Sequence, residues 1–176
     1  VGVNFSATTD ANNGVINLGD LAVDGTIALT THGTGDATVV NDDGLNFAAS
    51  TIGGDLIATA SAGDVVQIGA LNIVGATTIT ATGNDVTLDT ATNDFDSDDS
   101  NSTGRNVTIT GKDVKIRDTD NIFLGRQTVS GNLTVTAGGN IDDGDILTVT
   151  GTTTITGGGY VKFNNTGGSD YVGTVN

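Results

Sequence analysis

Apolar residues and threonines alternate along short stretches of the chain, and Gly, Asn and Asp residues separate these stretches. The clearest example is residues 129–161, in which one unit is written twice. Alternation of this kind predicts half-buried β-strands, and the glycine pairs predict turns between them. The matching positions of the two copies lie 20 residues apart: Val129 and Val149, Gly131 and Gly151, Val135 and Ile155, Gly138 and Gly158, Gly139 and Gly159, and Ile141 and Val161.

The same unit recurs earlier in the chain, and a longer period overlays it. Ile52, Gly54, Ala58 and Ala60 are followed 21 residues later by Ile73, Gly75, Ile79 and Ala81. Residues 52–60 also match residues 129–137 at an offset of 77, and after one deleted residue the match continues at 76, from Leu71 to Leu147. A super-repeat made of several short units explains both spacings.

We therefore predict an all-β fold, a single-stranded parallel β-helix (β-solenoid) with about 20 residues per coil. The general crossover rule for parallel strands, and not the periodicity, predicts that this β-helix is right-handed. Roughly eight or nine coils spaced ~4.8 Å apart would form a rod about 40 Å long. Val and Ile should stack in columns inside the rod and Thr outside it, with Gly at the corners. The structural repeat positions are expected at Gly54, Gly75, Gly111, Gly131, Gly151, Ile79, Val135 and Ile155.

The whole chain, residues 1–176, reads as one continuous solenoid segment. Its first residue is not Met, and it carries no signal peptide, so we expect a segment of a longer repetitive protein. Residues 96–106 form the most polar stretch and are predicted to protrude from the stack as a loop.

Composition narrows the classes of partner. The chain has 6 basic and 21 acidic residues, a net charge of −15, which disfavours nucleic acid and anionic membrane surfaces as partners. No apolar run is long enough to insert into a membrane. Aromatic residues make up 4%, and Cys, Pro, Met and Trp are absent, which suits a narrow aliphatic core without disulfides.

Three segments carry a resemblance to a known family. The segment from Gly131 to Ile141, the run Leu147–Ile155 and the tripeptide Asn93-Asp94-Phe95 are similar to repeats of filamentous-haemagglutinin-like large exoproteins. That resemblance implies a right-handed β-helix shaft of a bacterial adhesin exported by two-partner secretion. It also implies an extracellular or cell-surface location, and it transfers no binding residue to this chain.

Four aspartates are the candidate metal ligands. Asp94, Asp96, Asp98 and Asp99 alternate as ligands for a hard cation do, which makes calcium a candidate. The glycine and the distant glutamate of a calcium loop are missing, so a solvated acidic loop is the alternative explanation. No other cofactor is indicated.

Catalysis has little support, and we expect no enzyme. His32 is the only histidine and stands beside Gly33 in a predicted turn. Lys112, Lys115 and Arg117, with Arg126 further on, would be needed to neutralise an acidic sugar. Lys115 and Arg117 are explained better as outward strand charges that discourage lateral aggregation.

The function expected from these observations is a stiff spacer, the structural shaft of an extracellular bacterial adhesin or surface fibre. Its partners would be further repeats of the same polypeptide or identical copies end to end. The alternatives are a self-assembling extracellular filament subunit and an adhesive module that binds calcium, host glycans or surface glycans.

Overall fold

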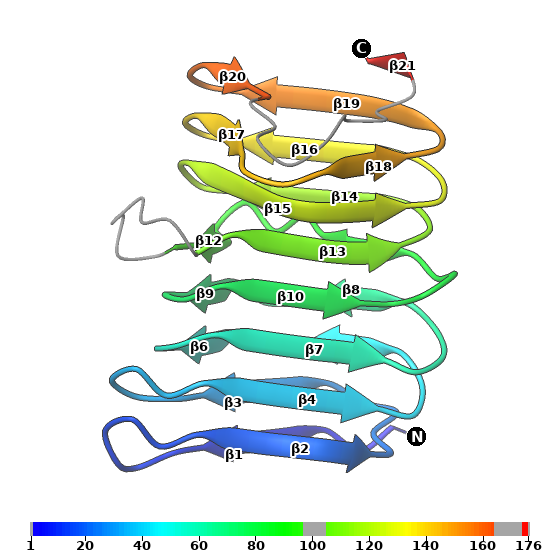
Figure 1. The fold of residues 1–176 in the computed structure, drawn as a ribbon. Coiled ribbons are helices and arrows are strands. Elements are labelled where there is room, and N and C mark those ends of the chain that lie inside the picture. Colours follow the sequence, from blue (N-terminus) through cyan, green and yellow to red (C-terminus); the bar gives the residue numbers. More distant parts are fainter. Residues whose placement is uncertain (1, 97–104, 164–173, 176) are drawn as a thin grey trace.

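The computed structural model describes residues 2–96, 105–163 and 174–175. The described chain forms parallel β-strands wound into a β-solenoid of about 8 coils, each about 20 residues long (Figure 1). The prediction of a parallel β-solenoid is therefore confirmed. The predicted loop at residues 96–106 falls mainly outside the described residues.

Each coil contributes strands first to a sheet that we call sheet A and then to a facing sheet that we call sheet B. In chain order the strands are β1 (Phe5–Thr8), β2 (Ile16–Leu21), β3 (Ile27–Thr30), β4 (Ala37–Asn41), β5 (Leu45–Phe47), β6 (Ser50–Ile52), β7 (Leu56–Ala60), β8 (Val65–Gln67), β9 (Leu71–Ile73), β10 (Thr77–Thr80), β11 (Val86–Leu88), β12 (Asp94–Phe95), β13 (Val107–Gly111), β14 (Val114–Asp118), β15 (Ile122–Val129), β16 (Leu133–Ala137), β17 (Ile141–Asp143), β18 (Leu147–Val149), β19 (Thr152–Gly157), β20 (Val161–Lys162) and β21 (Thr174–Val175).

Sheet B contains β2, β4, β7, β10, β13, β15, β17, β18 and β20, and the other strands form sheet A. In Figure 1 the strands of sheet B run from left to right in front, and those of sheet A return from right to left behind, while the chain climbs. This winding is right-handed, as the crossover rule for parallel strands requires.

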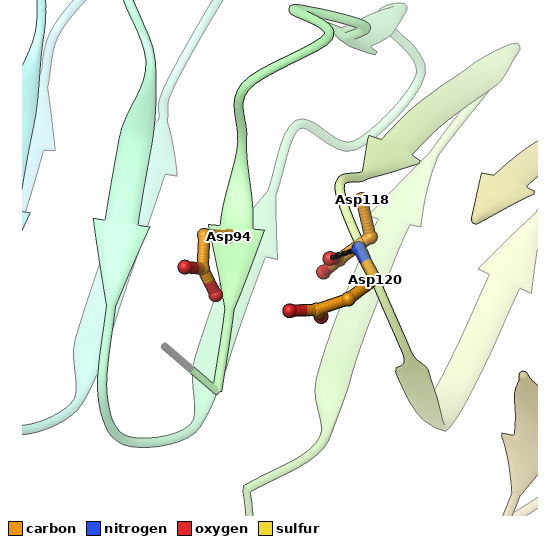
Figure 2. Close-up of side chains that lie close together, drawn as sticks. All are labelled: Asp94, Asp118 and Asp120. Atoms are coloured by element: carbon orange, nitrogen blue, oxygen red, sulfur yellow. Dashed lines mark hydrogen bonds between the residues drawn. The ribbon is translucent and has the colours of Figure 1, made fainter. Parts of the chain in front are cut away.

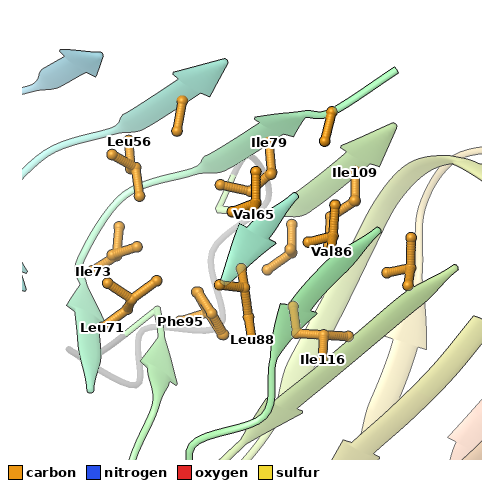
Figure 3. Close-up of a cluster of buried hydrophobic side chains, with 14 of the residues drawn as sticks. Leu56, Val65, Leu71, Ile73, Ile79, Val86, Leu88, Phe95, Ile109 and Ile116 are labelled. Carbon is orange, nitrogen blue, oxygen red and sulfur yellow. The ribbon is translucent and has the colours of Figure 1, made fainter. Parts of the chain in front are cut away.

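The core lies between the two sheets and is filled by aliphatic side chains. Along most strands buried and less buried residues alternate, as in β16, where Leu133, Val135 and Ala137 point inward. Figure 3 shows Leu56, Ile79 and Ile109 of sheet B facing the apolar side chains of sheet A. Few large rings are needed because the space between the sheets is narrow, and Phe47 and Phe95 are the largest fully buried side chains.

The predicted stacking of like residues is confirmed in the described ladders. Val135 pairs with Ile155, Val129 with Val149 and Ile141 with Val161. Ile52 likewise pairs with Ile73, and Ala58 with Ile79. The 20- or 21-residue period of the sequence is therefore the length of one coil.

The glycine corners hold ladders of Asn and Asp side chains that link one coil to the next. Asp113 Oδ1 accepts the backbone N–H of Asn132 at 2.7 Å, and Asn132 Oδ1 accepts that of Thr152 at 2.9 Å. A Cβ on Gly131 would collide with Asp113 Oδ1, and one on Gly151 would crowd Asn132 Oδ1. Glycine is thus required here by lack of space.

The 77-residue super-repeat has a geometric meaning that the sequence does not reveal. The strand β7 of sheet B matches β16 of sheet A, and β10 of sheet B matches β19 of sheet A. Every matched pair of described strands is exchanged between the sheets in this way, from β4 and β14 to β11 and β20. One super-repeat therefore spans three and a half coils, and successive repeats are related by half a turn about the rod axis.

The polar side chains at the corners and in the core follow the same half-turn relation between repeats. Asp36 Oδ1 accepts the N–H of Asp55, and Asp55 Oδ1 that of Ala76, each at 2.8 Å. This ladder repeats, half a turn round the rod, the ladder that joins Asp113, Asn132 and Thr152. The buried polar side chains correspond as well: Asn41 and Asp118, Ser50 and Gln127, and Thr77 and Thr153. The half-buried Gln67 corresponds to the buried Asp143.

Candidate functional site

The predicted calcium ligands do not stay together in the part of the chain that the structure describes. Asp98 and Asp99 lie outside the described residues. Asp96 forms an ion pair with Arg105 at 3.0 Å. Asp94 instead lies beside Asp118 and Asp120, which come from the next coil, with oxygen atoms of all three within 4.8 Å of one another (Figure 2).

Asp118 is the buried member of this acidic group. Its side chain is 2% exposed, at the end of β14. One carboxyl oxygen accepts the N–H of Phe95 and the other accepts the N–H of Asp120, each at 3.0 Å. The local sequence Val-Lys-Ile-Arg-Asp explains this placement, because Asp118 falls on the inward side of the strand with Val114 and Ile116.

Burial dominates the ionisation of Asp118. The loss of solvent around the carboxyl, reinforced by the nearby charge of Asp120, raises the pKa of Asp118 from 3.8 to about 8. The two backbone N–H donors act in the opposite direction and do not overcome the burial. Asp118 is therefore mainly protonated at neutral pH.

The corresponding residue of the first repeat shows what this position does for the fold. Asn41 occupies the place of Asp118, is fully buried, and accepts the N–H of Val23 at 2.9 Å through Oδ1. The N–H of Phe95 bonds to Asp118 in the same way. Asp118 thus shares the acceptor role of Asn41, linking the end of its strand to the coil before it.

Asp94, Asp118 and Asp120 together offer carboxylate oxygens, which are the ligands that a hard cation prefers. A bound cation would compete with the proton on Asp118, because metal ligands must be deprotonated. Calcium binding stays a prediction for this chain. Sequence reasoning missed Asp118 and Asp120. The match of Asp118 to Asn41 in the super-repeat is the signal that could have identified Asp118.

Two of the predicted basic residues, Lys115 and Arg126, form ion pairs with aspartates of neighbouring segments. Lys115 Nζ lies 2.5 Å from Asp89, and Arg126 lies 3.2 Å from Asp145. These pairs support the interpretation of the basic residues as outward strand charges. The exposed ring of His32 contacts the backbone oxygen of Thr9 next to the predicted turn, where Gly33 has a φ of 65°.

Lys112 sits on an acidic column that follows one corner of the rod. Its Nζ lies 3.5 Å from Asp85 and 3.8 Å from Asp113. Asp64 precedes them in the column, because its Oδ1 accepts the N–H of Asp85 at 2.9 Å. Two shallow hollows of about 200 and 160 Å³ open along this corner. Both are open to solvent and lack a convergent set of catalytic groups; the first is lined largely by Asp, Gly and Val, and the second largely by Asp and Thr.

The predicted glycine positions fall into two groups. The N–H of Gly75 bonds to the backbone oxygen of Gly54 at 2.9 Å, and that of Gly151 bonds to Gly131 at 2.8 Å, so these four stack at corners. Gly111 differs, because it ends β13 and pairs with Val129 inside sheet B. The glycine spacing alone does not distinguish a corner from a strand end.

The fold and the ladders define a repeat protein of the β-solenoid class. Residues 34–102 and 111–176 both match the family described as repeats of unknown function, DUF5649, and the chain belongs to that family. The two matched segments begin 77 residues apart, which is the super-repeat of the sequence. Comparison with curated proteins and comparison with solved structures each found no match.

Among the described residues there is no helix of the length and apolar character needed to cross a membrane.

Proposed function

We propose that this chain acts as a stiff spacer, a shaft segment of an extracellular bacterial adhesin or surface fibre. The observation that carries the proposal is the continuity of the two sheets. Sheet A runs as a continuous ladder from β1 through β3, β5, β8, β11, β14, β16 and β19 to β21, and sheet B runs likewise from β2 to β20. Such a stack resists bending because every coil is held to its neighbours by a ladder of backbone hydrogen bonds.

The surface favours a mechanical role over a catalytic one. Lys112, Lys115 and Arg126 form ion pairs with aspartates, and the described hollows are shallow. The net charge of −15 keeps the rod soluble and repels neighbouring rods, which limits lateral association. The surface location is an expectation taken from the family resemblance of the repeats.

Lengthening the protein tests the spacer role. Chains carrying one and two additional repeats would be compared with the present chain by small-angle X-ray scattering. A spacer lengthens by three and a half coils, about 17 Å, for each repeat, while its cross-section stays constant. Growth in width, or a maximum dimension that does not change, would contradict a shaft.

Self-assembly into a filament is the second candidate, favoured by apolar residues at the end of the stack. Val161 and Phe163 are 44% and 37% exposed at that end. Sedimentation over a wide range of protein concentration distinguishes the two functions. A spacer sediments as a monomer throughout, whereas a filament subunit sediments faster as its concentration rises.

A further inference from the structure

Two junctions between repeats are visible in the chain, and they are built alike. Residues 1–33 precede the first matched segment, yet β1, β2 and β3 occupy the places of β10, β11 and β13. At the first junction β2 pairs with β4, the leading strand of the repeat at residues 34–102. At the second junction β11 pairs with β14, the leading strand of the repeat at residues 111–176.

The registers of the two junctions agree residue by residue. At the first, Ile16 pairs with Ala37 and Leu18 with Val39. At the second, the corresponding partners are Val86 with Val114 and Leu88 with Ile116.

The hydrogen bonds that precede each leading strand agree as well. The N–H of Ile16 bonds to the backbone oxygen of Asp36 at 2.9 Å, and that of Val86 to Asp113 at 2.8 Å. A leading strand thus has an Asp before it, two inward apolar residues, and Asn41 or Asp118 at its end.

A third junction is half formed at the far end of the stack. The strand β20 takes the place of β11, so that Val161 and Phe163 stand where Val86 and Leu88 stand one repeat earlier. Val86 and Leu88 are 0% exposed, whereas Val161 and Phe163 are 44% and 37% exposed. Within the described residues β20 pairs with β17 and lacks a strand on its outer side.

The strand β21 supports this correspondence independently. It pairs with β19 as β13 pairs with β10, because Thr153 faces Val175 just as Thr77 faces Val107. The first step of a junction is therefore present on sheet A, and the second step, on sheet B, has an open place.

The geometry points to the outer edge of β20, with Val161 and Phe163, as a docking surface for the leading strand of a further repeat of the same polypeptide. That repeat would enter on sheet B, half a turn round the rod from β14 on sheet A. The strand that fits has the pattern of β4 and β14. An Asp comes first, two apolar residues separated by one polar residue follow, and an Asn or Asp stands two positions after the second apolar residue. This inference rests on junction geometry and does not depend on the spacer role.

A second copy of the chain fits this edge less well. Its nearest strands would be β1 and β2, which occupy the places of β10 and β11. Stacking them on β19 and β20 would place like strand on like strand and omit the leading strand. The order found at both described junctions would be lost.

The test is a chain lengthened in register. Val175 takes the place of Val107, so a copy of residues 109–176 is joined directly after Asn176. The extended and present chains are each prepared in three forms: unchanged, with Val161→Ser and Phe163→Ser together, and with the control Lys162→Ser. Lys162 lies between the two apolar residues, at the position that the exposed Thr87 has one repeat earlier. Thermal unfolding and amide hydrogen exchange at Val161 are measured in all six proteins.

Docking predicts a single unfolding transition for the extended chain, with a higher midpoint than the present chain. The Val161 amide should exchange about tenfold slower or more, since Ile16 and Val86 donate hydrogen bonds at their junctions. The double variant should lower the midpoint far more in the extended chain than in the present one, and Lys162→Ser should change neither.

Two separate transitions, or equal effects of the double variant in both chains, would overturn the assignment even if the extended protein proved longer. Dimers of the present chain that disappear with Val161→Ser and Phe163→Ser would show that a second copy binds the outer edge of β20. That result would also overturn the assignment.

Discussion

Asn41 and Asp118 accept the same hydrogen bond at two successive repeat junctions. The N–H of Val23 bonds to Asn41 Oδ1 at 2.9 Å, and the N–H of Phe95 bonds to Asp118 Oδ2 at 3.0 Å. The two side chains have nearly the same size, but only the aspartate can ionise, and Asn41 also donates from Nδ2 to the backbone oxygens of Val23 and Gly44. Exchanging the two residues at several pH values therefore separates the effect of charge, which depends on pH, from that of the amide hydrogen bonds, which does not.

Asp118→Asn should make the protein less sensitive to pH. The pKa of Asp118 is about 8 in the folded state and 3.8 in its ordinary state, so between these values the folded chain keeps a proton that the unfolded chain has lost. The contribution of this residue to stability is complete below pH 3.8 and is lost as the pH rises toward 8. The slope is at most about 1.4 kcal/mol per pH unit.

Urea unfolding at pH 5 and pH 8 measures this effect as the difference between variant and parent, which cancels the other carboxylates. Asp118→Asn should gain stability relative to the parent as the pH rises. Asn41→Asp is the matched control and should lose stability over the same range. Parallel pH profiles for all three proteins would show that Asp118 is not held neutral.

Gly131→Ala should destabilise the protein by about 1–3 kcal/mol, because the new Cβ meets Asp113 Oδ1 and breaks the corner ladder. Gly19→Ala is the control, since nothing lies within 4 Å of a Cβ there. Combining Gly131→Ala with Asp113→Ala removes the collision, so the double variant should cost less than the sum of the single variants. Strict additivity in urea unfolding would reject a steric cause.

Leu133→Ala should cost about 2–5 kcal/mol, because the leucine is fully buried between the sheets and its truncation leaves a cavity. The adjacent Thr134 points outward on the same strand. Thr134→Val keeps the β-branched shape and should change the free energy of unfolding by no more than about 0.5 kcal/mol. Similar losses for both variants would mean that β16 does not alternate between core and surface.

Lys112→Gln should weaken the stack modestly at low salt. Its ammonium lies between Asp85 and Asp113 of successive coils, so its removal leaves two like charges facing each other. The expected loss is below about 1 kcal/mol, because all three side chains are about half exposed to solvent. This loss should be smaller when thermal unfolding is measured in 0.5 M salt, because at roughly this concentration charges are screened within a few ångströms. A loss that does not change with salt would point to packing instead of charge.

Much of this architecture could be predicted because the physical period of the fold is written directly into the sequence. Val135 and Ile155 stack because they lie one coil apart, and the alternation around them shows which side faces the core. The exchange of sheets could not be predicted. An offset of 77 residues gives no indication of whether a repeat contains a whole or a half number of coils, which depends on the length of every corner.

The acidic group shows the limit for the candidate site. Asp94 and Asp96 are close in sequence, but one approaches Asp118 of the next coil and the other approaches Arg105. Residues that stack on one another in a solenoid are a full coil apart in sequence. The coil around β12 is longer than the others, because the paired residues Thr77 and Val107 are 30 positions apart. Local spacing therefore could not identify which carboxylates meet.

The half-turn between successive repeats also determines how the rod behaves over long distances. A coil that is slightly thicker on one side tilts its neighbours, and units that all faced the same way would add these tilts into an arc. Turning each unit to the opposite side reverses the tilt, so the errors cancel in pairs. A long array of such units would run straight even though no single unit is symmetric.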